Sequence, residues 1–380
     1  MKKIEILEPT ILKSSKKLLS NSLAKNQVST SSRQIIEKFE KKISVISGSR
    51  YVISTNTGSA ALYVGLKSLG IKKNDLIIMP SYTFIATPNS CILAGGSPWF
   101  FDIEKNSLTL DLKQIEQKLK SETFKSGKYY YHKSTKQRIF AICPVYTLGF
   151  LPELSRIKKL AKKYNLKVIA DAACAIGANY NKKKLSYYND AVIYSFNGNK
   201  SITSGGGGAL CVNKASIKNR ACLFVSNGKK GQYFHDSFGL NLKITGLHAA
   251  LGLGQLIEMK KIFKIKAQLR KKYLTFFNKN NLKTFSLNKK SYSSLWLNFL
   301  ITKKDISIKL IKTANNLKIN LNYFWMPMHL QPFLKSELKE NMRNTNFLWK
   351  KILILPSSLH LNNKNFLAIK KFLLKNINFL

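Results

Sequence analysis

Acidic residues are scarce in this 380-residue chain, which has 18 Asp and Glu against 64 Lys and Arg and a formal net charge of +46. Long apolar runs are absent too, because none approaches the roughly 20 residues that span a membrane. The N-terminus, Met1 to Glu5, carries charges and lacks the apolar segment of a secretory signal. We therefore expect a cytoplasmic protein that makes no contact with a membrane.

Cysteines are few, and none of the five forms a C-x-x-C pair. Their spacing argues against a zinc site and against a disulfide framework. Four of them lie in apolar surroundings typical of small core residues. We expect no metal ion.

The excess of positive charge is shared with nucleic-acid-binding proteins, whose basic residues gather on one surface. Here the lysines are spread along the whole chain, without a basic arm or an aromatic-basic motif. We therefore expect no specific nucleic-acid partner and interpret the charge as a composition bias. It would still attract anionic small molecules such as nucleotide-linked substrates.

Short apolar runs alternate with amphipathic segments over the first two thirds of the chain. This rhythm predicts an α/β fold with a mostly parallel, mixed seven-stranded sheet and flanking helices. The predicted strands are Tyr51–Ser54, Leu76–Met79, Pro98–Asp102, Phe140–Val145, Lys167–Asp171, Ala191–Ser195 and Ala209–Val212. The predicted helices between them are Ser59–Ser68, Phe84–Leu93, Asp111–Leu119 and Pro152–Tyr164.

The length of the chain suits two domains packed together. From about Leu247 the pattern changes to one long helix, or a helix with a break, over Leu247–Leu274 and then to short elements. We predict a large domain over residues 1–246 and a smaller C-terminal α/β domain over residues 247–380. The polar, basic segment Lys120–Arg138 is predicted to be a surface loop or hairpin.

Lys200 and Asp171 are the two residues that point to a type of reaction. Asp171 closes an apolar strand, and Lys200 lies just ahead of four consecutive glycines, Gly205–Gly208. A carboxylate that keeps a pyridine nitrogen protonated, with a lysine that forms a Schiff base, is typical of pyridoxal phosphate enzymes. Taken alone, Asp171 is equally well explained as a helix cap, and Lys200 as one lysine among many.

Two further motifs favour the same cofactor. Thr57-Gly58-Ser59 lies between a strand and a helix, where free N–H groups accommodate a phosphate, although a plain N-cap explains it as well. Phe84 follows a strand, in the region where open α/β sheets bind ligands, and an aromatic side chain there could stack on a cofactor ring. By itself, Phe84 fits a core residue better than a cofactor platform.

In this order the motifs resemble the DegT family of pyridoxal phosphate-dependent nucleotide-sugar aminotransferases, which have fold type I, the aspartate aminotransferase fold. The resemblance runs from about Glu8 to about Gln255 and continues more loosely through residues 324–332 and 355–358. The run Ser195-Phe196-Asn197-Gly198-Asn199-Lys200 is similar to the branch that acts on precursors of nonulosonic acids and related amino sugars.

The resemblance implies roles for individual residues. Lys200 would form the Schiff base and shuttle the proton, and Asp171 would pair with the pyridine nitrogen. Asn241 would reach the cofactor phosphate of the neighbouring subunit, so the enzyme would be a homodimer with shared active sites. The residues implied in cofactor binding are Thr57, Gly58, Ser59, Phe84, Asp171, Cys174, Ser195, Lys200 and Asn241.

Substrate contacts are implied for Tyr146, Lys243 and His329. Four places depart from the family pattern. Cys174 stands where many members have Gln, His or Glu, and Tyr146 replaces a histidine. Lys243 replaces an arginine and so loses a bidentate fork, and Thr245-Gly246 replaces a usual Pro-Asn. Such changes would shift the substrate or weaken the enzyme.

The implied function is amination of a nucleotide-linked 4-keto-6-deoxy sugar, with glutamate as donor, for surface polysaccharide or glycan biosynthesis. One alternative is a pyridoxal phosphate-dependent sugar dehydratase, in which a histidine occupies the lysine position, so Lys200 argues against it. Another is a non-catalytic or regulatory relative, to which the replacements at Cys174, Tyr146 and Lys243 would point.

Overall fold

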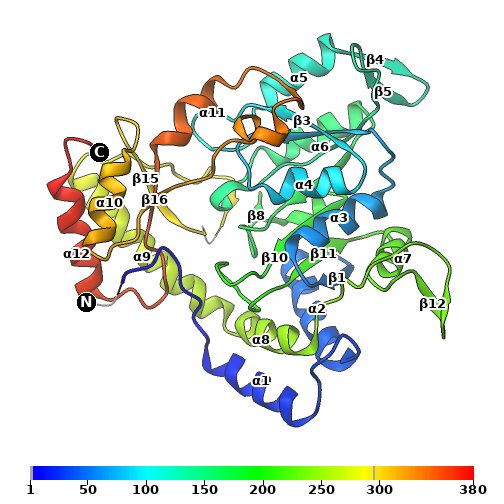
Figure 1. Ribbon diagram of the computed structural model, residues 1–380, viewed down its shortest axis with the longest axis horizontal. Coiled ribbons are helices and arrows are strands. Elements are labelled where there is room, and N and C mark those ends of the chain that lie inside the picture. Colours follow the sequence, from blue (N-terminus) through cyan, green and yellow to red (C-terminus); the bar gives the residue numbers. More distant parts are fainter. Residues whose placement is uncertain (1–2, 294–295) are drawn as a thin grey trace.

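The computed structural model describes residues 3–293 and 296–380 (Figure 1). A large sheet covered by helices occupies one side of the molecule, and a smaller lobe built around α9, α10 and α12 occupies the other. The described part of the chain begins and ends in the smaller lobe. No helix within the described residues is both long and apolar enough to cross a membrane.

The central sheet has eight strands in the order β1-β11-β10-β7-β6-β2-β3-β17. Only β11 runs antiparallel to its neighbours; the remaining pairs are parallel. The strands are β1 Tyr51–Thr55, β2 Leu76–Pro80, β3 Ser97–Phe101, β6 Ile139–Ile142, β7 Lys167–Asp171, β10 Ala191–Ser195, β11 Gly208–Val212 and β17 Leu338–Lys339. All seven predicted strands are present, and β17 adds an eighth at the edge, from a segment too short to show a strand pattern.

Helices cover both faces of the sheet, which is why its strands are apolar throughout. One apolar cluster joins the sheet to α2, α5, α6 and α8, and a second joins it to α3, α4 and α7. The bounds of these helices are α2 Arg33–Ser47, α3 Gly58–Leu69, α4 Ala86–Leu93, α5 Leu112–Ser121, α6 Leu154–Lys163, α7 Ala215–Phe224 and α8 Gly246–Ile257. The helix predicted from Phe84 thus begins at Ala86 and leaves Phe84 in the preceding turn.

The predicted hairpin in segment 120–138 is confirmed as β4 Thr123–Ser126 and β5 Tyr129–His132. The predicted long helix is two helices, α8 and α9 Met259–Lys279, that meet at Glu258. Helix α8 packs on α2 and on α1 Lys13–Ala24, beneath the sheet in Figure 1. The boundary at residue 246 stays a prediction.

The smaller lobe has its own apolar cluster, formed by α9, α10 and α12 with β15 and β18. Ile4, at the start of the chain, is buried in this cluster and pairs in parallel with Ile319. The elements are α10 Ile308–Asn316, α12 Asn363–Lys375, β14 Ser291–Tyr292, β15 Asn298–Ile301, β16 Asn322–Tyr323 and β18 Ile352–Leu355. The remaining elements are β8 Asn179–Tyr180, β9 Lys183–Lys184, β12 Lys229–Gly231, β13 Phe234–His235, α11 Arg343–Leu348 and 3₁₀ turns at Thr147–Gly149, Leu185–Tyr187, Met328–Leu330, Pro332–Leu334 and Trp349–Lys351.

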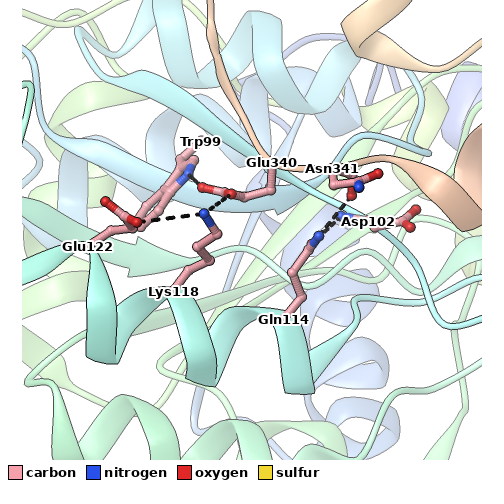
Figure 2. Close-up of polar contacts among 7 residues, drawn as sticks. All are labelled: Trp99, Asp102, Gln114, Lys118, Glu122, Glu340 and Asn341. Carbon is pink, nitrogen blue, oxygen red and sulfur yellow. Dashed lines mark hydrogen bonds and ion pairs between the residues drawn. The ribbon is translucent and has the colours of Figure 1, made fainter.

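A set of polar contacts fastens the segment around β17 to the edge of the large sheet (Figure 2). Glu340 accepts a hydrogen bond from Trp99 Nε1 at 3.0 Å, and its carboxylate forms an ion pair with Lys118 Nζ at 2.8 Å. Asp102 accepts from the backbone N–H and the hydroxyl of Thr345, at 2.8 and 2.6 Å. These bonds hold the segment that contains β17 against the edge of the large sheet.

Candidate active site

The junction of β1 and α3 forms one end of the site. Thr57 caps the helix, because its Oγ1 accepts from Ala60 N at 3.0 Å. Gly58 and Ser59 begin the helix, where the amides have no acceptor within the helix. A Cβ on Gly58 would come 2.9 Å from Ser195 Cβ, so glycine is required for this close approach. Amides and hydroxyls at a helix N-terminus suit a phosphate.

Asp171 lies at the carboxyl end of β7 with its side chain buried. Its carboxylate accepts hydrogen bonds from Thr87 Oγ1 at 2.8 Å and from Ala173 N at 3.1 Å. Burial raises the pKa of this carboxyl, while the two hydrogen bonds and the charge of Lys200 oppose the rise. A cation in the cavity would complete its stabilisation.

Lys200 lies in the turn after β10, and its ammonium group faces two side chains. Its Nζ is 3.5 Å from Cys174 Sγ and 4.0 Å from the centroid of the Trp296 ring. Burial raises the pKa of the Cys174 thiol, and the nearby Lys200 charge works against that rise. The thiol is therefore a neutral neighbour of the lysine near neutral pH.

A cavity of about 270 Å³ joins these parts. Nine of the residues singled out in the sequence line it: Thr57, Gly58, Ser59, Phe84, Tyr146, Asp171, Cys174, Ser195 and Lys200. They come from segments that span residues 57–200, and the parallel sheet brings them together because the carboxyl ends of its strands share one edge.

Two aromatic side chains shape the wall of the cavity. Phe84 is 54% exposed, and its ring centroid is 6.0 Å from that of Trp325. Tyr146 is fully buried, and its hydroxyl oxygen accepts from Asn189 Nδ2 at 3.1 Å. Burial raises the Tyr146 pKa, so the side chain stays neutral. Phe84 is thus placed for contact with a ligand, and Tyr146 forms part of the cavity wall.

Asn241, Lys243 and His329 do not line this cavity. Asn241 and Lys243 are exposed; Asn241 pairs with Ser226 and Lys243 with Thr55 in isolated β-bridges. His329 is half-buried; its Nδ1 lies 2.6 Å from Ser81 Oγ and its Nε2 lies 2.9 Å from Asn346 Oδ1. Their roles stay predictions.

Five polar or aromatic residues that line or support the cavity escaped the sequence analysis as functional residues: Thr87, Asn197, Asn199, Trp296 and Trp325. Thr87, Asn197 and Asn199 lie in motifs already recognised, one helical turn or less from Phe84 or Lys200. Trp325 lies in the segment 324–332, which the resemblance covers more loosely. Trp296 has no such motif, and nothing in its local sequence pattern points to a cavity around residue 200.

The sequence profile of the DegT/DnrJ/EryC1/StrS aminotransferase family matches residues 9–372. The chain belongs to this family. Aminotransferases of the DegT family depend on pyridoxal phosphate, which confirms the cofactor expected from the sequence. The large mixed sheet with helices on both faces is likewise the architecture of fold type I.

Relatives in this DegT family cover nearly the whole chain. GDP-perosamine synthase of Escherichia coli O157:H7 is 28% identical over 97% of this chain and 97% of its own. A UDP-4-amino-4,6-dideoxy-N-acetyl-beta-L-altrosamine transaminase of Campylobacter jejuni is 27% identical over 91% and 90%. The solved structure of Helicobacter pylori PseC, an aminotransferase involved in pseudoaminic acid biosynthesis, superimposes with a TM-score of 0.86 at 22% identity over 99% of this chain and 100% of that one.

The residues present fit pyridoxal phosphate. A helix N-terminus with hydroxyls from Ser59 and Ser195 matches its phosphate, and Gly58 leaves the room that a Cβ would fill. The buried carboxylate of Asp171 matches a protonated ring nitrogen, and Lys200 supplies the amine. All four groups open into the same cavity, so one molecule could contact them together.

Proposed function

We propose that this chain transfers an amino group from glutamate to the keto carbon of a nucleotide-linked 4-keto-6-deoxy sugar, for surface polysaccharide or glycan biosynthesis. The observation that carries the proposal is the convergence of Lys200, Asp171 and the Gly58–Ser59 helix start on one cavity. Relatives named as a GDP-sugar synthase and a UDP-sugar transaminase support the substrate class.

Pyridoxal phosphate, when bound, supplies an aldehyde that carries the amino group and a ring that takes up electrons. Asp171 would hold a proton at the ring nitrogen, and its burial would strengthen that pairing. Ser59, Ser195 and the first amides of α3 would bind the phosphate. Lys200 Nζ would take a proton from the donor carbon that bears the amino group and deliver it to the aldehyde carbon of the cofactor; for the keto sugar it would move a proton in the opposite direction.

The surrounding surface suits an anionic substrate. The net charge of +46 gives the molecule a field that attracts a nucleoside diphosphate. Lys243 is exposed beside the strand that leads to Gly58, and a lysine offers a point charge for a diphosphate. His329 and Tyr146 remain our candidates for contacts on the sugar side.

We infer that the active enzyme is a homodimer with shared active sites. Asn241 is exposed and lies outside the cavity of its own chain. The hairpin β12–β13 beside it exposes large apolar side chains, among them Tyr233, Phe234 and Phe238. Exposed aromatic groups of this kind favour association, and a partner subunit would bring Asn241 to the neighbouring phosphate.

Adding L-glutamate to protein loaded with pyridoxal phosphate should bleach its visible absorbance band. The Lys200→Ala variant should lack this response, whereas Lys214→Ala, which removes a lysine outside the cavity, should keep it. A Lys200→Ala protein that bleached and turned over normally would refute the assignment. A panel of GDP-, UDP- and dTDP-linked 4-keto-6-deoxy sugars, followed by mass spectrometry, identifies the acceptor by replacement of the keto oxygen with an amino group.

Mixing two inactive variants tests the shared site. If Asn241 serves the neighbouring subunit, Lys200→Ala and Asn241→Ala homodimers, dissociated and reassociated together, should regain activity, because each mixed dimer contains one intact site. No regain, in samples whose mixed dimers are demonstrated by mass, would show that each subunit builds its site alone.

A further inference from the structure

Trp296 is held by a hydrogen bond at each of its polar groups. Its backbone N–H donates to Leu148 O at 2.9 Å, its carbonyl accepts from Lys266 Nζ at 2.8 Å, and its indole Nε1 donates to Asn199 O at 2.6 Å. The residue is 6% exposed. Three bonds to three separate segments leave the indole ring a single orientation.

The face of this ring lies against the amine of Lys200. The distance of 4.0 Å between Lys200 Nζ and the ring centroid is well inside the range of about 6 Å over which a cation is attracted to an aromatic face. The indole N–H holds the carbonyl of Asn199, the residue directly before Lys200. Trp296 thus contacts Lys200 both at its backbone neighbour and at its reacting nitrogen.

Lys266 supports this arrangement from α9. Its side chain is buried, and its one hydrogen bond within residues 3–293 and 296–380 goes to the Trp296 carbonyl. Burial lowers the pKa of Lys266 to about 8, which reflects the cost of a buried ammonium group that lacks a carboxylate partner. An apolar residue would fill this place at a lower cost in free energy, but it could not donate a hydrogen bond to the Trp296 carbonyl. We therefore interpret the lysine as a residue that holds Trp296 in place.

We propose that Trp296 is a positioning residue whose ring face holds the Lys200 amine at the cavity wall, and that Lys266 fixes Trp296. The proposal rests on the role proposed above for Lys200. The other groups that act on the Lys200 charge are the carboxylate of Asp171 and the thiol of Cys174. Asp171 also favours the cation, while the neutral thiol does not.

The experiment is a pH titration of the visible absorbance band of protein loaded with pyridoxal phosphate, which reports the charge on the nitrogen of Lys200. Trp296→Leu should move the midpoint down by about 0.5 to 1 pH unit, since an aromatic face stabilises a cation by that amount. Trp296→Phe keeps a ring face and should move it less. Lys266→Met should move it in the same direction, and Trp349→Phe, at the edge of the same apolar cluster, should leave it unchanged.

Steady-state kinetics with glutamate provide a second measurement. A misplaced amine lowers kcat by about tenfold or more, whereas KM for the donor changes little. If Trp296→Leu folds poorly, Trp296→Phe and Lys266→Met still decide the matter. Midpoints and kcat values equal to those of the parent protein would overturn the positioning role and leave Lys200 as the reacting amine. A parent protein without any band would instead refute the proposed function.

Discussion

Thr87 donates its hydroxyl proton to Asp171 Oδ2 over 2.8 Å and so joins the first turn of α4 to the carboxyl end of β7. A second hydroxyl, that of Thr83, lies 2.9 Å from Thr87 Oγ1. The bond opposes the rise in the pKa of Asp171 that burial causes. It therefore favours Asp171 in the role of a counter-ion.

Replacing Thr87 with Val should raise the pKa of Asp171 further and weaken cofactor binding. We expect affinity for pyridoxal phosphate at neutral pH to fall by about tenfold to a hundredfold, the value of one hydrogen bond to a charged group. Quenching of protein fluorescence on titration with the cofactor measures this. Thr87→Ser keeps the hydroxyl and should bind like the parent; equal affinities for the Val and Ser variants would contradict the prediction.

Gly58 should tolerate no larger residue. In Gly58→Ala the new methyl group would lie 2.9 Å from Ser195 Cβ, so one of the two segments that we propose bind the phosphate must move. We expect cofactor affinity to fall by about tenfold or more, or 1.4 kcal/mol. Gly198→Ala is the control, because its methyl group would meet nothing closer than 3.8 Å. Isothermal titration of both variants decides; similar losses in the two would disprove the steric argument.

Glu340→Ala should destabilise the whole protein. Glu340 is the acceptor of Trp99 Nε1 and the partner of Lys118 at the edge of the sheet (Figure 2), and its removal leaves a buried indole N–H without an acceptor. We expect the free energy of unfolding in urea to fall by about 1 to 3 kcal/mol. Glu122→Ala removes an exposed partner of the same lysine at 3.7 Å and should cost no more than about 0.5 kcal/mol. Equal losses of stability in the two variants would contradict the role of Glu340 in stabilising the edge of the sheet.

Lys266 should make stability depend on pH in the alkaline range. Its pKa is about 8 in the folded protein and ordinarily 10.5, so between these values the unfolded chain binds more protons and stability increases with pH. The penalty is complete below about 8 and absent above about 10.5. The free energy of unfolding of the parent protein, minus that of Lys266→Met, should rise by up to about 3 kcal/mol across this window. If the difference between the two free energies of unfolding does not change with pH in paired urea titrations, the lowered pKa of Lys266 is excluded.

The sequence predicts the central sheet well, because strands buried on both faces are apolar throughout and alternate with helices. Segments such as Leu76–Pro80 need no tertiary information to be recognised. The edge strand Leu338–Lys339 is different, since two residues carry no periodicity and their pairing with β3 depends on the contacts of Glu340.

The site divides in the same way. Gly58, Asp171 and Lys200 lie in local motifs whose chemistry is readable, and the sheet brings them to one cavity. Trp296 has no such motif; its place beside Lys200 follows from bonds to Leu148, Lys266 and Asn199, which only the folded chain brings near one another.

The pairing of Ile4 with Ile319 has a consequence for synthesis on the ribosome. Glu5 bonds to Asn320, which is 315 positions further along the chain, so Glu5 can form this contact only after those residues have been made. At about 5 to 20 residues per second, this delay is roughly 15 to 60 s. Throughout it the segment ahead of α1 stays available to chaperones and proteases, while strands β1 to β11 of the large sheet can pair as they emerge.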